Sequence, residues 1–498
     1  MKNQTIIEKG LVKKKFRKGM KKIALFYPSN YNIAMSSLIY HRIYFLLNDI
    51  DDIYVERFFI DIRDENTGRL RSLENRMNLE NFDYIIVPIH YELDYVNIIK
   101  ALMSSNIEIY SIRREKPKII LGGPTVTANP EPLGDLSDIE IIGDLEAVWD
   151  DLIDIIRNDS IEPKRGIYVP KLGKIETEEA IAKSIFKSDY RRILSKEAKF
   201  TLAVEAMRGC PFNCLFCMES YITKPVRYKE YDDIIKEINE LNSRYGEKIT
   251  LMGLTLNSHP RFKEILKYSI ENKIDISLPS LRAELLDEDS IKMISKLRQL
   301  TLTIAPESSE RIRNALGKNI SNDDIINVAR YAKKYNMNLK LYLMVSIPGE
   351  NKEDLKEMVE LTKEIKKIGV KKIHLSVNPL VIKPRTPLQW LPMNSEKNMK
   401  EKIKYIRENA LYDDITIYDP FYALIQGGIS LSDRNVLKHL IDVSIGQGKP
   451  SWRRALNNGL AENAIREKHE PFPWSHIKGF IEEAIMKKIL EAFLNRIS

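Results

Sequence analysis

The sequence predicts an α/β protein: an N-terminal Rossmann-like parallel sheet domain, a partial (β/α)6 barrel after it, and a mostly helical C-terminal segment. Three observations predict this. Short, nearly continuous apolar runs alternate with stretches of helical periodicity in the first third of the chain. From Lys199 the same strand-then-helix alternation recurs six times, and from Asn394 it gives way to helical and irregular sequence. At 498 residues the chain is too long for one ordinary core.

The first domain is expected over residues 22–160. Its strands are the runs "KKIALFYP", "YIIVPIH", "KIILGGP" and "IEIIGD", with helical patterns such as "SSLIYHRIYFLLN" and "LDYVNIIKALMSS" between them. Ligands of parallel sheets bind at the carboxyl ends of the strands. Residues 27–30, 90–92 and 122–125 are therefore expected to face a crevice.

Two stretches flank this domain. Residues 1–21 form a basic arm, which we interpret as a frayed, solvated terminus, with contact to RNA or anionic lipid as the alternative. Residues 161–198 have mixed charge and little periodicity, which predicts a linker with one short hairpin or helix.

The barrel is expected over residues 199–393. Its six strands are "FTLAVEAM", "KITLMGLTL", "IDISLPS", "LTLTIAP", "LKLYLMVSIP" and "KIHLSVNPLV". Six units fall short of the eight of a closed (β/α)8 barrel, so an open barrel is predicted. Residues 394–498 form the C-terminal segment, which contains Trp474 and His476; we interpret these two as a packed aromatic corner rather than as substrate contacts.

Composition restricts the class of protein. Hydrophobic residues make up 43% and charged residues 30% of the chain, which is typical of globular rather than disordered proteins. No run approaches the roughly 18 apolar residues of a membrane span. The basic arm is not followed by the apolar stretch that is typical of a secretory signal. Three cysteines in so long a chain provide no disulfide framework, which indicates a reducing compartment and a cytoplasmic protein.

All three cysteines lie in "RGCPFNCLFC", as Cys210, Cys214 and Cys217. Their spacing is C-x3-C-x2-C, on the loop after the first barrel strand, where the active sites of β/α barrels lie. Structural zinc takes four protein ligands, and here the nearest downstream histidine is His259. A four-iron cluster held by three thiolates leaves one iron open, and we favour the cluster over zinc. A zinc-bearing nucleic-acid-binding protein remains an alternative.

The cysteine motif, with Phe216 as its aromatic residue, resembles the signature of the radical SAM superfamily. Further stretches of the barrel resemble a branch of that superfamily related to methylthiotransferases: "SLPSLR", "APESSERIRNALGKN", "LYLMVSIPGE" and "IKPRTPLQW". The stretches "YPSNYNIAMSSL", "YELDYVNIIKAL" and "GGPTVTANPEPL" resemble the cobalamin-binding-like N-terminal domain of that branch, and "PFPWSHIKGFIEEAIMKKIL" resembles its C-terminal segment.

The resemblance implies a [4Fe-4S] cluster on the three cysteines, S-adenosyl-L-methionine (SAM) as cosubstrate, and an external electron donor such as a flavodoxin or ferredoxin. It also implies a set of cofactor-binding residues, which are Phe216, Gly253, Arg282, Glu307, Arg311, Val345 and Pro348.

Several of these roles have alternatives. Glu307 could be a capping carboxylate and Arg311 a surface arginine. Pro348 could be an ordinary turn residue, and Arg282 could form a salt bridge beside the site rather than clamp a carboxylate or phosphate.

The stretch "LMGLTLNSHP" departs from the family pattern, because Gly253 is not followed by the Gly-Glu that receives the methionine amine. Thr255, Asn257, Ser258 or backbone carbonyls are expected to replace that contact.

The sequence lacks cysteine and histidine motifs that particular classes of radical SAM reaction require. Methylthiotransferases need a second cluster on three further cysteines, and this chain has none. No Asp-x-His-x-x-Gly motif surrounds His41 or His90, so cobalamin has no motif histidine ligand, although binding without one stays open. The expected activity is reductive SAM cleavage and modification of an RNA or a biosynthetic small molecule. The alternatives are a cobalamin-dependent radical methyltransferase and a non-enzymatic iron–sulfur redox protein.

Overall fold

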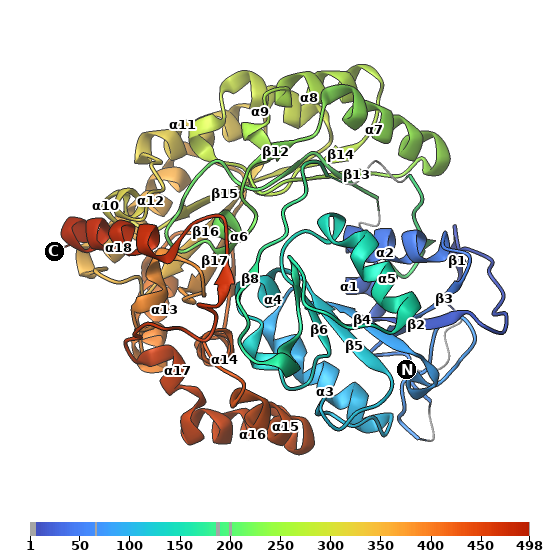
Figure 1. Cartoon of the computed structure of the whole chain (residues 1–498). Coiled ribbons are helices and arrows are strands. Elements are labelled where there is room, and N and C mark those ends of the chain that lie inside the picture. The colour runs from blue at the N-terminus through green and yellow to red at the C-terminus, as the bar shows by residue number, and fades with distance from the viewer. Residues whose placement is uncertain (1–5, 65–66, 186–189, 199–201, 498) are drawn as a thin grey trace. The chain divides into compact units, whose positions relative to one another are not determined.

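The structure is a computed structural model that describes residues 6–64, 67–185, 190–198 and 202–497 (Figure 1). The chain divides into two compact units. Unit 1 comprises Met1–Leu202, Ile429–Ala461 and Glu470–Gly479, and unit 2 comprises Ala203–Gly428, Glu462–His469 and Phe480–Ser498. No described helix is long and apolar enough to cross a membrane.

Unit 1 is built on a six-stranded sheet, and five of its strands run parallel. In spatial order the strands are β3 (Ile53–Phe59), β2 (Lys21–Tyr27), β4 (Tyr84–Pro88), β5 (Lys118–Gly122), β6 (Ile139–Ile141) and the antiparallel β7 (Ile167–Tyr168). The predicted Rossmann-like fold is confirmed. Four of the strands, β2, β4, β5 and β6, lie in the predicted apolar runs.

Strand β3 was not predicted, because Glu56 and Arg57 interrupt its apolar run, yet all seven of its residues are buried. Burial of charged groups requires partners. The Arg57 guanidinium donates to Glu8 Oε2 at 2.6 Å and to Glu74 Oε1 at 2.5 Å. Glu56 accepts hydrogen bonds from Tyr54 and Asn75, each at 2.6 Å.

Helices of unit 1 cover the sheet. Helices α2 (Leu38–Asn48) and α5 (Trp149–Asn158) share one hydrophobic core with β2 and β3, while α3 (Tyr95–Ser104) packs on α15 (Val436–Gly446). The shorter helices are α1 (Tyr31–Ala34), α4 (Pro124–Ala128) and α16 (Gly448–Ala455).

The basic arm differs from a frayed terminus over its described residues. Strand β1 (Glu8–Lys9) pairs antiparallel with β9 (Leu194–Ser195). The Glu8 side chain is only 4% exposed, because it forms the buried ion pair with Arg57. The arm is therefore anchored to unit 1 by a charged residue, which a count of lysines and arginines does not reveal.

The residues predicted as a linker belong to unit 1. Besides β7 and β9, the stretch 161–198 contains β8 (Thr177–Glu178), which pairs in parallel with β19 (Ile477–Lys478). The linker prediction therefore differs from the structure, because β8 and β9 of this stretch pair with strands that lie far away in sequence.

The segment 394–498 is mostly helical, as predicted, but its residues divide between the two units. In unit 1, Arg434 Nε donates to Glu131 Oε2 at 2.8 Å, and the Asn129 amide donates to the carbonyls of Ser430 and Ser432. Trp474 is 1% exposed and forms the expected packed aromatic corner, with its ring 5.0 Å from that of Phe472.

Unit 2 contains the barrel, with its helices on the outside of the strands (Figure 1). Two parallel sheets, joined by a parallel bridge between Leu281 and Ile304, form it. The strands are β10 (Ala203–Glu205), β13 (Ile249–Met252) and β14 (Ile276–Ser277), then β15 (Thr301–Glu307), β16 (Asn338–Val345), β17 (Ile373–Pro379) and β18 (Asp414–Ile417).

All six predicted barrel strands are present among the described residues, and β18 adds a seventh parallel strand within the segment predicted as helical. Strand β18 is a short edge strand without a buried residue, so no apolar run marks it in the sequence. The helices between and after the strands are α6 (Met218–Ile222), α7 (Tyr231–Tyr245), α8 (Phe262–Glu271), α9 (Glu288–Lys296), α10 (Glu310–Ala315), α11 (Asn322–Lys334), α12 (Lys352–Ile368), α13 (Glu396–Asn409), α14 (Pro420–Ser430), α17 (Glu462–Ile465) and α18 (Glu483–Ile497).

The buried ion pair of the arm predicts a stability effect. Glu8→Gln leaves the Arg57 charge with one carboxylate fewer and should cost about 3 kcal/mol. The thermal transition of unit 1, followed by calorimetry, should fall by about 6–12 °C. Lys9→Ala, on the neighbouring exposed residue, should change the stability by less than about 0.5 kcal/mol. Equal Tm values for the two variants would contradict the anchoring role of Glu8.

Candidate functional site

The three cysteines lie on a loop at the carboxyl end of the first barrel strand. After β10, the hairpin of β11 (Met207–Arg208) and β12 (Arg227–Tyr228) encloses residues 209–226, here called the cysteine loop. Cys210 and Cys214 are buried and Cys217 is half-buried at the start of α6. The motif therefore lies where the sequence predicted it, at the end of the barrel that holds active sites.

The course of the cysteine loop is set by close backbone contacts. Gly209 has φ +83°, and a Cβ there would lie 2.8 Å from the carbonyl oxygen of Thr223. Lys224 Nζ donates to the carbonyl of Cys210 at 2.9 Å. Leu215 N donates to the carbonyl of Leu316 at 3.0 Å, which ties the loop to the end of α10.

Burial acts on the pKa of two of the three thiols. It raises the pKa of Cys214, and it raises that of Cys217 to about 11. At Cys214 the cations of Lys318 and Arg282 act in the opposite direction. A thiol must lose its proton to become a ligand, so metal binding here releases protons.

Arg282 is placed beside the sulfur of Cys214. Its Nη1 donates to Cys214 Sγ at 3.7 Å, and its guanidinium carbon lies 3.6 Å from the ring centroid of Phe212. Nε donates to Glu284 Oε1 at 2.5 Å. The structure thus gives Arg282 both a salt bridge and a contact with a predicted ligand.

A second cation, Lys318, lies beside Phe216, the other aromatic residue of the motif. Lys318 Nζ lies 5.9 Å from the ring centroid of Phe216 and 2.7 Å from Glu307 Oε1. Glu307, at the end of β15, has φ +62°. Its carboxylate accepts a hydrogen bond from Lys318, a partner that the sequence analysis did not identify.

The turn after β13 holds the residues expected to replace the missing Gly-Glu. Thr255 Oγ1 lies 3.0 Å from Cys210 Sγ, and Ser258 Oγ donates to the carbonyl of Thr255 at 2.8 Å. The Asn257 side chain donates to the carbonyl of Arg282 and accepts from its amide, at 2.8 and 3.2 Å. Gly253 permits a close approach, since a Cβ there would lie 2.5 Å from Met207 Cγ.

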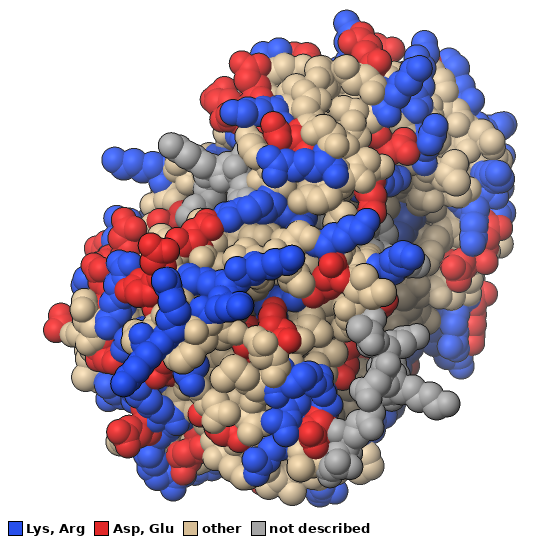
Figure 2. All heavy atoms as spheres, turned by 90° about the vertical axis from the view of Figure 1, so that its right-hand side faces the viewer, with Lys and Arg blue, Asp and Glu red and all other residues tan. Residues whose placement is uncertain are grey.

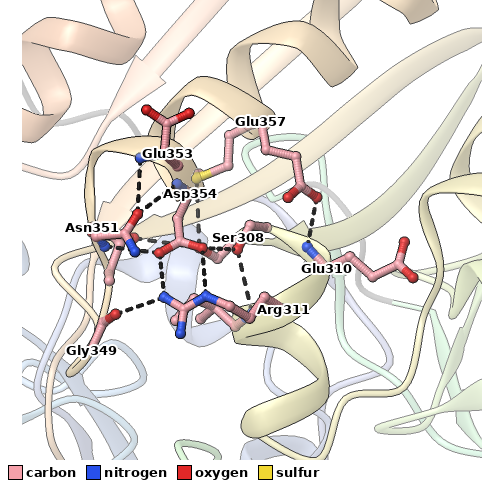
Figure 3. Close-up of polar contacts among 12 residues, drawn as sticks. Ser308, Glu310, Arg311, Gly349, Asn351, Glu353, Asp354 and Glu357 are labelled. Atoms are coloured by element: carbon pink, nitrogen blue, oxygen red, sulfur yellow. Dashed lines mark hydrogen bonds and ion pairs between the residues drawn. The ribbon is translucent and has the colours of Figure 1, made fainter. Parts of the chain in front are cut away.

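Arg311 lies in a polar network between α10 and α12 (Figure 3). Its Nη2 donates to Asp354 Oδ2 at 2.6 Å and to the carbonyl of Gly349 at 2.8 Å. Asp354 also accepts from Ser309 Oγ at 2.6 Å and from the amide of Asn351 at 2.8 Å. The structure gives Arg311 and Glu307 separate partners rather than bringing them together.

The remaining predicted residues lie at the end of β16. Val345 is its last, buried residue, and Pro348 is half-buried in the turn that follows. Glu350 closes this turn by accepting from the Ser346 amide at 2.8 Å and from Lys402 Nζ at 2.7 Å. The side chain of Glu350 is fully buried, so loss of Lys402 would leave a buried carboxylate without its ion pair.

The sequence analysis missed three residues of the site: Phe212, Glu284 and Lys318. Phe212 lies two residues before Cys214, so the motif contained the signal for it. Lys318 lies beside Phe216, and Glu284 belongs to the site through its ion pair with Arg282; only the tertiary structure shows these contacts. Within the described residues, no three His, Cys, Asp or Glu side chains form a group around a single metal ion.

Two family models match the chain, one within each unit. Residues 40–176 match the model described as "Radical SAM proteins, N-terminal", and residues 204–362 match the model described as "Radical SAM superfamily". The second match begins within β10, includes the cysteine loop and continues past β16.

Two curated relatives illustrate the sequence similarity. The chain is 31% identical over 439 residues to "Uncharacterized protein MJ0966" of Methanocaldococcus jannaschii, covering 85% of this chain and 91% of the relative. It is 23% identical over 285 residues to the "tRNA-2-methylthio-N(6)-dimethylallyladenosine synthase" of a Sulfurihydrogenibium species, a match that covers 54% of this chain and 65% of that enzyme.

Two solved structures share the fold at 11% sequence identity. One is the radical S-adenosylmethionine methyltransferase TsrM from Kitasatospora setae, with cobalamin and a [4Fe-4S] cluster bound (TM-score 0.56, 89% of this chain and 99% of that chain). The other is the cobalamin-dependent S-adenosylmethionine radical enzyme OxsB with aqua-cobalamin (TM-score 0.51, 96% and 80%).

The backbone of the cysteine loop predicts a matched pair of glycine variants. Gly209→Ala introduces a Cβ against the Thr223 carbonyl at positive φ, so the loop should shift and anaerobically reconstituted protein should bind less iron. Gly246→Ala, also at positive φ but with open space around it, should cost about 1 kcal/mol and retain the wild-type iron content. Iron analysis that finds the two variants equal would contradict this account of the loop.

Proposed function

Because the chain belongs to the radical SAM superfamily, we propose that this enzyme reductively cleaves SAM at a [4Fe-4S] cluster on Cys210, Cys214 and Cys217 and then modifies an RNA or a small biosynthetic molecule. The cluster and SAM are the cofactors of the family. Together they supply a 5′-deoxyadenosyl radical that abstracts hydrogen from an unactivated position. The observation that supports the proposal is the placement of the chain's three cysteines on one loop at the carboxyl end of β10.

The donor set fits such a cluster. Three soft thiol ligands come from one loop, and the sequence contains no fourth cysteine to close the coordination. The contact of Thr255 with Cys210 Sγ and that of Arg282 with Cys214 Sγ are the hydrogen bonds to sulfur that orient ligands and adjust a metal centre.

For SAM we propose contacts at the ends of β13, β15 and β16. The side chains of Asn257 and Ser258 are bonded to the protein, so backbone carbonyls after Gly253 are the better partners for the methionine amine. Val345 and Pro348 would offer backbone to adenine, and Phe216 would contribute from the cysteine loop. Arg311 would bind a carboxylate only by exchanging its ion pair with Asp354, and Glu307 would act alongside Lys318.

RNA is favoured as substrate class by the basic arm and by the tRNA-modifying name of one relative. Lys13, Lys15, Arg17 and Lys18 are exposed, and the Phe16 ring beside them is 47% exposed. Exposed cations with an aromatic ring between them suit phosphate contacts and base stacking. In Figure 2, Lys and Arg side chains are numerous on the face shown, and acidic side chains lie among them.

We further propose that a flavodoxin or ferredoxin supplies the electron and that the enzyme works in a reducing cytoplasm. A non-enzymatic iron–sulfur redox protein would also bind a cluster, but adding SAM would not change its EPR spectrum. The spectrum with and without SAM therefore separates the two functions.

The direct test is SAM cleavage by anaerobically reconstituted protein under dithionite. Wild type should release 5′-deoxyadenosine, and the triple variant Cys210→Ala, Cys214→Ala, Cys217→Ala should lose this activity and its iron, because no ligand remains. Adding cellular RNA should increase 5′-deoxyadenosine release if RNA is the substrate class. A triple variant that still cleaves SAM would refute the proposed site.

Cobalamin-dependent radical methylation is the second candidate, and the fold likeness to TsrM and OxsB favours it. In unit 1, His90 follows β4 at the carboxyl edge of the sheet, exposed, with its ring 6.1 Å from that of Tyr27. Protein incubated with hydroxocobalamin should retain corrinoid absorbance after gel filtration, and His90→Ala should retain it too, since no ligand motif surrounds His90. Wild-type protein without corrinoid absorbance would exclude this candidate.

A further inference from the structure

Arg282 is the cation that directly contacts a cysteine sulfur in the described part of the chain. Its Nη1 lies 3.7 Å from Cys214 Sγ, and the residue is 9% exposed. A guanidinium stays charged at all physiological pH values. A fixed positive charge therefore lies in a water-poor position beside the middle ligand of the motif.

The position of this charge is restrained on several sides. The guanidinium stacks on Phe212, 3.6 Å from the ring centroid, and Phe212 belongs to the cysteine loop itself. Glu284 holds Nε at 2.5 Å. Asn257 holds the backbone of Arg282 through both its amide and its carbonyl. A side chain restrained by stacking, an ion pair and a backbone clamp is preorganised, so its charge acts at a defined distance.

The carboxylate of Glu284 opposes the electrostatic effect of Arg282 on Cys214. It partly offsets the charge of Arg282, and its Oε2 is buried and lacks a hydrogen-bond partner. The net field at Cys214 thus combines one cation in contact with sulfur and one anion behind it with the more general effect of the Lys318 cation.

Resting on the proposed function, we propose that Arg282 is a positioning residue that raises the reduction potential of the cluster through Cys214 Sγ, with Glu284 as its counterweight. Hydrogen bonds to sulfur and local net charge are the protein's means of setting cluster potentials. A cation next to a ligand thiolate stabilises the reduced cluster, which carries one more negative charge. Arg282 then makes electron transfer from a modest donor easier, and it does so without touching substrate.

The test is an EPR-monitored redox titration of the reconstituted protein without SAM. Arg282→Gln should lower the equilibrium constant for one-electron reduction about tenfold, a shift of about −59 mV. Glu284→Gln, which keeps the hydrogen-bond acceptor but removes the negative charge, should shift the potential in the positive direction. Arg282→Lys retains the charge but neither the fork nor the stacking, so its potential should lie between those of wild type and Arg282→Gln.

A matched control is Arg298→Gln, because Arg298 is 83% exposed and pairs with Asp275 at 3.3 Å. Its potential should equal that of wild type. Wild-type protein that binds no cluster would refute the proposed function. If the wild type binds a cluster, two results would refute only the role of Arg282. One is an unchanged potential in Arg282→Gln. The other is a shift in the same direction in Arg282→Gln and Glu284→Gln, which a structural disturbance would cause. Should Arg282→Gln not hold iron, the opposed shifts of Glu284→Gln and Arg282→Lys decide the question.

Discussion

Burial of thiols on one short loop, complete at Cys210 and Cys214 and partial at Cys217, is the constraint on which the site at this end of the barrel depends. A buried thiol resists ionisation, and the pKa of Cys217 rises to about 11 for this reason. Such a site serves as a ligand set only when metal binding offsets the desolvation of the thiolates. The surrounding residues supply what a loop of apolar and thiol side chains lacks: a hydroxyl beside Cys210 and two cations near Cys214.

The two aromatic residues of the motif have a shared structural role. Phe212 and Phe216 flank Cys214 by two residues on each side, and each ring faces a cation that is itself paired with a carboxylate. Cation–aromatic contacts gain strength where water is excluded. The aromatic side chains of the cysteine loop therefore lie against the charges that approach the sulfurs.

Both units use C-terminal residues to complete structure that begins elsewhere in the chain. In unit 1, Arg434 pairs with the fully buried Glu131, and β19 extends β8. In unit 2, α18 packs near α10, and its Ile497 lies 2.7 Å from the position that a Cβ on Gly349 would take. Removal of the C-terminal segment would therefore leave buried charges unpaired in unit 1 and an exposed turn in unit 2.

The sequence by itself determined the two α/β units, the six barrel strands, the cysteine motif and its place after the first strand, because these depend on local periodicity and spacing. The tertiary structure decided the rest. Strand β3 has charged residues that only long-range ion pairs make compatible with burial, and β18 is an edge strand without an apolar run. The partners of the site residues, such as Lys318 for Glu307, Asp354 for Arg311 and Cys214 for Arg282, are 11 to 68 residues away in sequence. The tertiary structure brings these partners together, and no local sequence pattern encodes their contacts.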